Sequence, residues 1–406
     1  MHFDIHLRKD VAEMIDDIAQ EIFDWNAPDS LSKSEIESLA EYVQTFDHCA
    51  RPDRPFLIGG ADGSGDFPCV SYGDAVAYLV TAMSRLYEAA ANKLVEKPTG
   101  VDRIIQMLWL SDDKDKSEGK YKEFFAKIMG YSLEAVCQES DYYELSRAKG
   151  CRLPSPVDML DNLVLPPAHE ADNIGIQMRN TAEAGALIQL MRSLDTTDIK
   201  NKPVYILEDT TMALPLLPSK TALFFEIAKR YACKIARDKG IAFMTLSKSH
   251  NMPRMDLIEA MIEQINPKME HWFMRLPTEQ EEESIPSFIG SRSIPPFGAV
   301  TYLFRLHKTT QTMRLDMDYV FWKKNIWNED KMIMSRNEKQ IFRDLDFASH
   351  DQRCFGYPYP IKACHDMASL TKEERVAFRK LVIDRMVGKG LRRKNFIDPS
   401  IQTGHA

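Results

Sequence analysis

The segment FLIGGADGSGDFP at positions 56–68 places an apolar run directly before a carboxylate set among glycines. Residues 56–61 are typical of a buried strand, and the following ADGSG is typical of a Gly-rich turn. A carboxylate at the end of a buried strand lies at the edge of a sheet, where α/β proteins form their sites. Asp62 is therefore a candidate site residue, although Asp-Gly is a common turn dipeptide and a turn is the simpler interpretation of this segment alone.

Other segments indicate the fold class. VYILED at 204–209 and IAFMTLSKS at 241–249 are typical of strands, and residues 219–240 between them predict a long helix. Two segments between 298 and 322 predict an antiparallel hairpin. This order indicates an α/β fold with a mixed β-sheet flanked by helices. The glycine cluster is neither GxGxxG nor followed by GK[ST], so nucleotide binding is poorly supported.

The chain is expected to have two parts. Residues 8–24 and 33–49 carry apolar side chains at helical spacing, so residues 1–50 are expected to form an N-terminal helical arm. Residues 51–406 are expected to form one α/β domain. Within it, residues 98–165 are expected to be a helical insertion, with a helix, a charged loop, a second helix and a closing segment that contains two prolines.

The composition excludes several classes of protein. The 406 residues include 52 Lys and Arg, 60 Asp and Glu, and 44% hydrophobic residues, with a formal net charge of −8. This balance excludes a disordered or fibrous chain, and it is compatible with a nuclease because local basic patches and bound metal set the field in a cleft. The seven scattered cysteines exclude a zinc finger and are typical of reduced thiols in the cytoplasm. The sequence has no apolar run long enough for a membrane span and no signal-peptide core.

A second pair of carboxylates follows the strand at 204–209. Side chains alternate across a strand, so only one of Glu208 and Asp209 is expected to face Asp62. The ordinary alternative is a turn in which Asp209 accepts from the amides that follow it. Carboxylates that lie close together repel unless a cation neutralises them. Because oxygen ligands suit Mg²⁺ and Mn²⁺, the two strand ends together predict a divalent-metal site.

The remaining candidates come from helices and another strand. Glu183 lies among small residues of a predicted helix, where a carboxylate more often faces solvent. Lys248 follows a strand, where it either contacts a scissile phosphate or is an ordinary surface lysine. GYPYPIKACH contains Tyr357, Tyr359 and His365 near the start of a helix. A lone His in that position is more often a packed or capping residue, but a His also transfers protons or binds metal near neutral pH.

Four ordered blocks of the sequence resemble the NurA nuclease family. ADGSG at 61–65 is similar to the family's early strand followed by Asp-Gly-Ser, and VYILEDTTM at 204–212 is similar to its second strand. IAFMTLSKS at 241–249 resembles its strand that ends in Ser-Lys. FGYPYPIKACHDMASLT at 355–371 resembles its C-terminal Gly-Tyr-Pro block with a His on a helix, and this block is the most specific. Together the blocks span roughly residues 55–385.

The resemblance implies a ribonuclease H-like core and a nuclease that cleaves DNA with Mn²⁺ or Mg²⁺, as an exonuclease, a single-strand endonuclease or both. The implied metal ligands are Asp62, Glu183 and Asp209, and the implied catalytic residues also include Lys248, Tyr357 and His365. The second block departs from the family, because it reads Glu-Asp-Thr-Thr where Asp-Gly-Ser-Leu is usual. We prefer Asp209 to Glu208 as the ligand because a small polar residue and then an apolar one follow it.

The resemblance also implies partners. It implies a cytoplasmic homodimer that works with a HerA-type hexameric ATPase translocase, in DNA end resection or in defence against phages. One alternative is a structural adaptor that docks on the translocase and gates DNA without cutting it. Another is a phosphotransfer enzyme or phosphatase, because strand-end carboxylates on an α/β fold serve those reactions as well.

Overall fold

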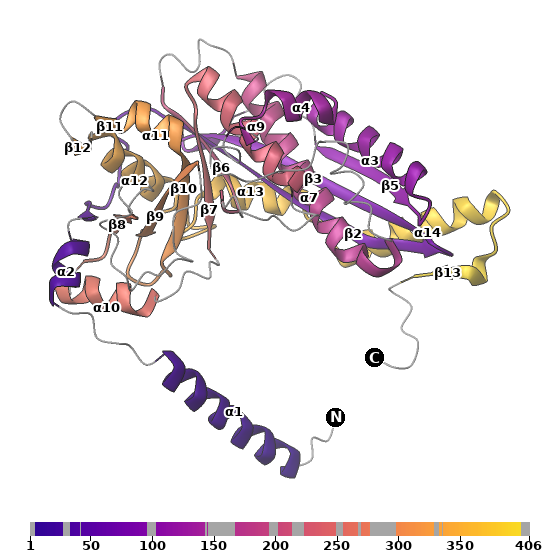
Figure 1. The fold of residues 1–406 in the computed structure, drawn as a ribbon, viewed down its shortest axis with the longest axis horizontal. Helices are drawn as coiled ribbons and strands as arrows, with labels where there is room; N and C mark the ends of the chain where they lie inside the picture. The colour runs from indigo at the N-terminus through magenta and orange to yellow at the C-terminus, as the bar shows by residue number, and fades with distance from the viewer. Residues whose placement is uncertain are drawn as a thin grey trace.

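An 11-stranded mixed sheet with helices on both faces dominates the part of the chain that the structure describes (Figure 1). The computed structural model describes residues 5–26, 33–40, 42–95, 103–142, 144, 167–194, 202–212, 223–248, 255–266, 269–276, 298–328, 333–334 and 336–398.

The strands of the large sheet are β1 (Val43–Thr45), β2 (Leu57–Tyr72), β3 (Ala75–Glu88), β4 (Lys93–Leu94), β5 (Ile104–Leu110), β6 (Val204–Glu208), β7 (Ala242–Ser247), β8 (Trp272–Arg275), β9 (Ala299–Arg305), β10 (Met313–Asp318) and β13 (Phe396–Ile397). A separate pair consists of β11 (Trp327–Asn328) and β12 (Ile333–Met334). The helices are α1 (Ile5–Asn26), α2 (Lys33–Ala40), α3 (Lys114–Met129), α4 (Leu133–Glu139), α7 (Pro167–Ser193), α9 (Leu223–Lys239), α10 (Met255–Ile265), α11 (Tyr319–Asn325), α12 (Arg336–Ala348), α13 (Tyr359–Ala368) and α14 (Lys372–Gly388), followed by a 3-10 turn at Arg393–Asn395.

The middle of the sheet has the strand order β5-β3-β2-β6-β7. The strands β2, β3 and β5 are antiparallel neighbours, whereas β6 and β7 run parallel to β2. Helix α9 connects β6 to β7, as a parallel pair requires. This is the arrangement of a ribonuclease H-like core, so the predicted α/β fold with a mixed sheet flanked by helices is confirmed. Beyond β7, the antiparallel strands β10, β9, β8 and β1 extend the sheet.

The helices α7 and α13 cover opposite faces of β2. Adjacent residues of a strand point to opposite faces. A Cβ atom added at Gly59 would lie 3.1 Å from Leu190 on α7, whereas one added at Gly60 would lie 2.9 Å from Ile361 on α13. The missing side chains let both helices approach the strand closely. We refer below to the α7 face and the α13 face of the sheet.

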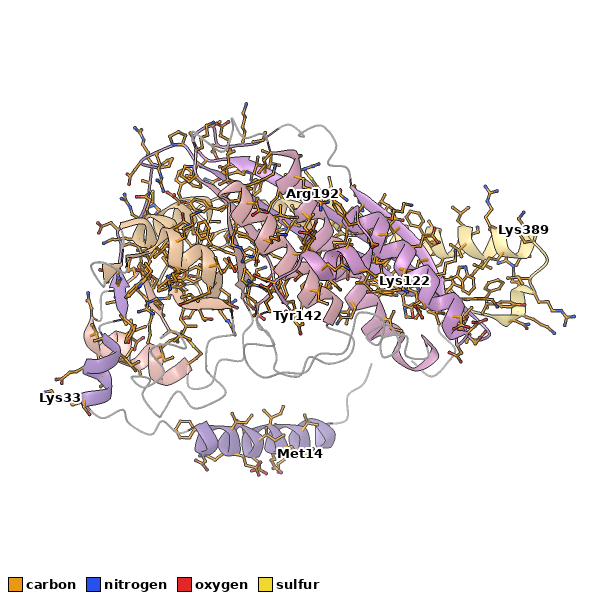
Figure 2. All side chains as sticks on the ribbon, turned by 45° about the horizontal axis from the view of Figure 1, so that its top comes forward. Met14, Lys33, Lys122, Tyr142, Arg192 and Lys389 are labelled. Atoms are coloured by element: carbon orange, nitrogen blue, oxygen red, sulfur yellow. The ribbon has the colours of Figure 1, made fainter. Side chains whose placement is uncertain are left out.

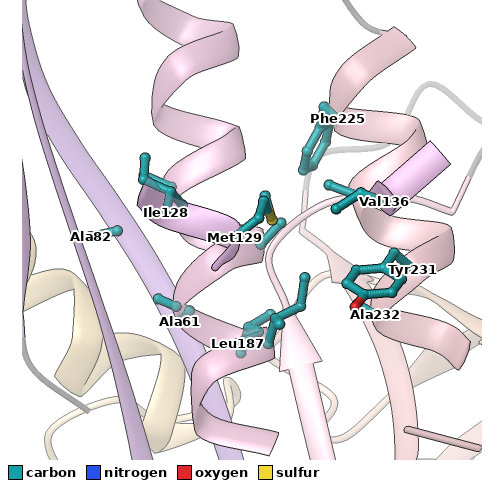
Figure 3. Packing of buried hydrophobic residues seen from close by; sticks show 14 of the residues in the cluster. Ala61, Ala82, Ile128, Met129, Val136, Leu187, Phe225, Tyr231 and Ala232 are labelled. Atoms are coloured by element: carbon teal, nitrogen blue, oxygen red, sulfur yellow. The ribbon is translucent and has the colours of Figure 1, made fainter. Parts of the chain in front are cut away.

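Small residues also shape the core on the α7 face. Ala61 of β2 and Ala82 of β3 lie in one buried cluster with Leu187 of α7 (Figure 3). A Cβ atom at Gly185 would meet Ile128 of α3 at 2.2 Å, so α3 packs on α7 at a glycine. Because a fully buried aliphatic side chain contributes about 1.5 to 3 kcal/mol, this cluster fixes α7 on the sheet firmly.

The predicted Gly-rich turn after residue 61 is wrong. Strand β2 continues through Asp62 to Tyr72, and Asp62 pairs with Met83 of β3. The turn comes later, where Gly73 adopts a left-handed conformation between β2 and β3. Pairing with a long partner strand therefore overrides the turn preference of Asp-Gly, and Asp62 lies within a strand instead of at its end.

The expected helical insertion also differs in part. Ile104–Leu110, which the sequence predicts to be helical, forms β5 and pairs with β3, so it belongs to the core sheet. The second helix of the expected insertion is present as Lys114–Met129, and it includes most of the expected charged loop. A further short helix forms at Leu133–Glu139, and residues 145–166 lie outside the described residues. The division of the chain into domains stays a prediction.

The N-terminal arm contains two helices and one strand. Its second helix ends at Ala40, earlier than expected, because Val43–Thr45 pairs with β8. Helix α1 lies apart from the sheet in both views, with Met14 on its surface (Figures 1 and 2). Its apolar side chains are exposed: Val11, Met14, Ile15, Ile18, Ile22 and Phe23. None of the described helices is long and apolar enough to cross a membrane.

Candidate active site

Two aspartates share the α13 face of the sheet. Ala61 of β2 is the register partner of Glu208 of β6, so the next residues of the two segments, Asp62 and Asp209, point away from the α7 face. Their surroundings agree with this placement. Nδ1 of His365 on α13 lies 2.8 Å from Oδ2 of Asp62, and Nζ of Lys248 lies 3.8 Å from Oδ2 of Asp209.

Tyr357 connects Asp209 to Lys248. Burial and the neighbouring Asp209 carboxylate raise the pKa of Tyr357 well above its usual value. Nζ of Lys248 lies 3.7 Å from the centre of the Tyr357 ring, which is a cation–π contact. Tyr359 instead packs on Tyr87, with a ring separation of 5.8 Å. The structure therefore brings Tyr357, and not Tyr359, to the predicted site.

Two glutamates lie on the α7 face beside these aspartates. Glu183 of α7 is 7% exposed and its Oε1 lies 3.2 Å from Nε of Arg179, one helical turn earlier. Glu208 at the end of β6 is 1% exposed, and both its carboxylate oxygens lack a hydrogen-bond partner. Glu183 is therefore buried among carboxylates, whereas the prediction from the sequence favoured solvent.

The two glutamates are held in their neutral form at pH 7. Burial raises the pKa of Glu183 to about 8, against the opposing effect of Arg179, and nearby carboxylates including Asp62 add to the rise. Burial likewise raises the pKa of Glu208 to about 8, although Lys229 opposes it. Burial also raises the pKa of Asp209, against Lys248. A desolvated carboxyl keeps its proton unless a cation stabilises the charged form.

Gly63 allows Glu183 to reach the strand. A Cβ atom at Gly63 would lie 2.7 Å from Oε1 and 2.9 Å from Cγ of Glu183, and 3.0 Å from the main-chain oxygen of Thr81. Distances below 3.0 Å are not tolerated without movement, so the glycine lets a carboxylate from a helix lie directly against β2 beside Asp62.

Replacing Gly63 by Ala is expected to destabilise the protein by about 1 to 3 kcal/mol, because the added methyl group overpacks the contact with Glu183. Urea unfolding measures this change. Gly119→Ala is the matched control, because Gly119 is exposed on α3 with no atom within 4 Å of an added Cβ. That substitution should be neutral or raise stability by up to about 1 kcal/mol. Equal stability of Gly63→Ala and the wild-type protein would contradict the predicted contact.

The donor set suits a divalent cation that prefers oxygen. A cation would stabilise the charged form of this group of carboxyls. The oxygens of Glu208 have no hydrogen-bond partner, the pKa of Glu183 is raised, and Asp62 and Asp209 lie nearby. Among the described residues, a different group of metal-type ligands is more compact than these carboxylates. Its ligand atoms lie within 4.8 Å of one another and belong to His48, His271, Asp346 and His350.

The structure thus brings together all six residues predicted from the sequence, through direct contacts or charge effects: Asp62, Glu183, Asp209, Lys248, Tyr357 and His365. Their roles stay predictions. Sequence reasoning missed Arg179 and Lys229 as the cations nearest the two glutamates. The spacing of Arg179 and Glu183, four residues apart in a helix, was a usable indication.

Comparison with known proteins finds similarity in structure but not in sequence. No family model matches the chain, and no curated protein matches it. The crystal structure of the NurA nuclease from Sulfolobus solfataricus is similar over 95% of this chain and 98% of its own, with a TM-score of 0.49 and 12% identity. A NurA structure bound to dAMP and manganese covers 95% of this chain and 98% of its own, with a TM-score of 0.39 and 10% identity.

Proposed function

We propose that this protein is a metal-dependent deoxyribonuclease. The observation that carries the proposal is the convergence of four carboxyls, Asp62, Glu183, Glu208 and Asp209, from β2, α7 and the end of β6. Two of them keep their protons near neutral pH because burial disfavours the charged form. Perturbed carboxyls beside a His and a Lys are typical of hydrolytic sites. The ordered sequence motifs support a nuclease of the NurA type.

The proposed metal ligands are Asp62, Glu183 and Asp209, with Glu208 as a buried neighbour. A bound Mn²⁺ or Mg²⁺ would activate a water molecule and neutralise charge on the phosphate. His365 is more than half exposed, with Nδ1 held by Asp62, and its remaining nitrogen can exchange a proton with the water or the leaving oxygen. Lys248 stabilises the charge that develops on the phosphate, and Tyr357 positions both Lys248 and Asp209.

The proposed substrate is DNA, cleaved as an exonuclease, a single-strand endonuclease or both. The proposed setting is a cytoplasmic homodimer that works with a HerA-type hexameric ATPase translocase in DNA end resection or anti-phage defence. The exposed apolar face of α1 supports a protein partner, because exposed apolar patches often mark interaction sites.

One observation favours a second candidate, an adaptor that docks on the translocase without cutting DNA. Each proposed metal ligand already lies beside a positively charged or titratable side chain. The pairs are Asp62 with His365, Glu183 with Arg179, and Asp209 with Lys248. Such pairing also stabilises carboxylates that bind no metal.

A cleavage assay on end-labelled single- and double-stranded linear DNA tests the function. The full-length protein is expected to cleave with Mn²⁺ or Mg²⁺ and to leave DNA intact in EDTA, because the phosphate needs a cation to neutralise it. Cleavage that persists in EDTA would contradict the metal-dependent mechanism. No cleavage with either metal, both alone and with a HerA-type ATPase, would favour the adaptor. Cleavage of small phosphate esters but not of DNA would indicate a phosphatase.

A further inference from the structure

A second group of metal-type ligands lies away from the carboxylate site. His48 comes three residues after β1, and His271 directly precedes β8. The antiparallel pairing of Thr45 with Trp272 brings these two histidines together. Asp346 lies in the last turn of α12, and His350 follows two residues after the end of that helix. Three segments that are distant in the sequence therefore meet at one point.

The ligand atoms surround the buried carboxylate of Asp346. Oδ2 of Asp346 lies 2.9 Å from Nδ1 of His48, and Oδ1 lies 3.3 Å from Nδ1 of His350 and 3.8 Å from Nε2 of His271. Four atoms about 2.0 to 2.1 Å from a tetrahedral Zn²⁺ lie roughly 3.3 Å from one another. The three separations above, measured to one or the other oxygen of Asp346, lie on both sides of that value, and one ligand atom from each of the four residues lies within 4.8 Å of the others.

Two of these atoms have no hydrogen-bond partner despite their burial. The Asp346 side chain is 0% exposed and the His271 side chain is 10% exposed. Nevertheless, Oδ1 of Asp346 and Nε2 of His271 are buried without a hydrogen bond. Buried polar atoms without partners are rare and costly, and an ion between them would satisfy both.

The surroundings hold the ligands in place. The main-chain N–H of Cys49 donates to Oδ2 of Asp346 at 2.7 Å, which orients the carboxylate. The Cys49 thiol donates to the main-chain oxygen of Arg51, and it is not one of the four grouped ligands. Phe46 packs edge-on against His271, and Phe355 packs edge-on against His350. An open cleft of about 740 Å³, lined by His48 and His350, gives an ion a route to the site.

We propose that His48, His271, Asp346 and His350 bind one Zn²⁺ ion as a structural site. Three imidazoles and one carboxylate are ligands that zinc prefers, whereas Mg²⁺ prefers oxygen ligands alone. Four protein ligands fill a tetrahedral shell, so this site has a structural role and does not activate water. The ion ties β1 and β8 to the end of α12. It thereby anchors the segment that leads from His350 to Tyr357 and on to α13, which carries His365.

Zinc titration of the full-length protein, stripped with EDTA and dialysed, tests the site. Calorimetry and metal analysis should show one equivalent of Zn²⁺ bound, with a rise in melting temperature. His48→Ala and His350→Ala should weaken zinc binding at least about tenfold and abolish the thermal shift. Both side chains are partly exposed, at 43% and 21%, so these variants should fold, which circular dichroism checks.

Two control variants test whether the bound zinc belongs to these four ligands. His307→Ala removes a nearby histidine that is outside the ligand set and should bind zinc like the wild-type protein. Asp62→Asn alters only the proposed nuclease site and should also bind one equivalent, so the two proposals can fail independently. Absence of zinc binding by the wild-type protein, or unchanged binding in both His48→Ala and His350→Ala, would overturn the assignment.

Discussion

Replacing Asp62 by Asn is expected to reduce metal-dependent DNA cleavage on the order of 100-fold or more, because it removes a negative charge from the proposed metal site. Asn has the same size and can still accept a hydrogen bond from the main-chain N–H of Gly63, as Oδ1 of Asp62 does at 2.7 Å. The strand pairing of β2 does not depend on this side chain. The loss should therefore appear in the cleavage rate and in Mn²⁺ affinity and not in the fold.

Asp366→Asn is the matched control for this prediction. Asp366 is an exposed carboxylate on α13, the residue after His365, and it pairs with Lys362. It lies near the site in sequence but is not a proposed ligand, so its replacement should leave cleavage within about twofold of the wild-type rate, since exposed ion pairs contribute little. Initial rates on end-labelled DNA over a range of Mn²⁺ concentrations measure both variants. Full cleavage by Asp62→Asn would refute the metal-site assignment.

The sequence predicts the core strands well where one physical effect dominates. VYILE and AFMTLS are mostly apolar, so they fit strands buried on both faces, and they form β6 and β7. The secondary-structure preference of a short segment predicted the wrong structure where pairing with a distant strand determines the conformation. ADGSG has the composition of a turn, but β3 offers it a complete ladder of pairing, so the strand continues. IIQMLWL is apolar on both faces of β5, so its periodicity alone does not distinguish a strand from a helix.

In the candidate site too, local motifs predicted some features, whereas others depend on the pairing of distant strands. The four sequence blocks led to Asp62, Asp209 and Lys248, which follow or lie within core strands. The register of β2 and β6, which no local pattern contains, places Asp209 on the face of Asp62 and leaves Glu208 on the other. The histidine group was missed because β1 and β8 are more than two hundred residues apart in the sequence, and only the spacing of Asp346 and His350 was a local indication.

Replacing Glu208 by Gln is expected to stabilise the metal-free protein at alkaline pH. Burial raises the pKa of Glu208 to about 8, and Glu226 and Asp209 add to the rise against Lys229. In the unfolded chain the same carboxyl has a pKa near 4.3. Between about pH 4.5 and 8 the folded protein therefore holds a proton that the unfolded chain has released, so the free energy of unfolding falls as the pH rises through this window.

Gln cannot ionise, so Glu208→Gln removes this loss of stability. The variant should be the more stable protein throughout this window, and between pH 5.5 and 8.5 in EDTA the difference in the free energy of unfolding should grow by on the order of 3 kcal/mol. Urea unfolding between pH 5 and 9 measures the divergence. Glu123→Gln, at an exposed position of α3, is the control and should follow the wild-type protein at every pH. The same pH dependence of the free energy of unfolding in Glu208→Gln and the wild-type protein would contradict the conclusion that burial raises the pKa of Glu208. Because a nearby divalent cation stabilises a charged carboxylate, Mn²⁺ should restore stability to the wild-type protein at pH 8.5 and reduce its difference from the variant. That result would connect the raised pKa of Glu208 to metal binding by the neighbouring ligands.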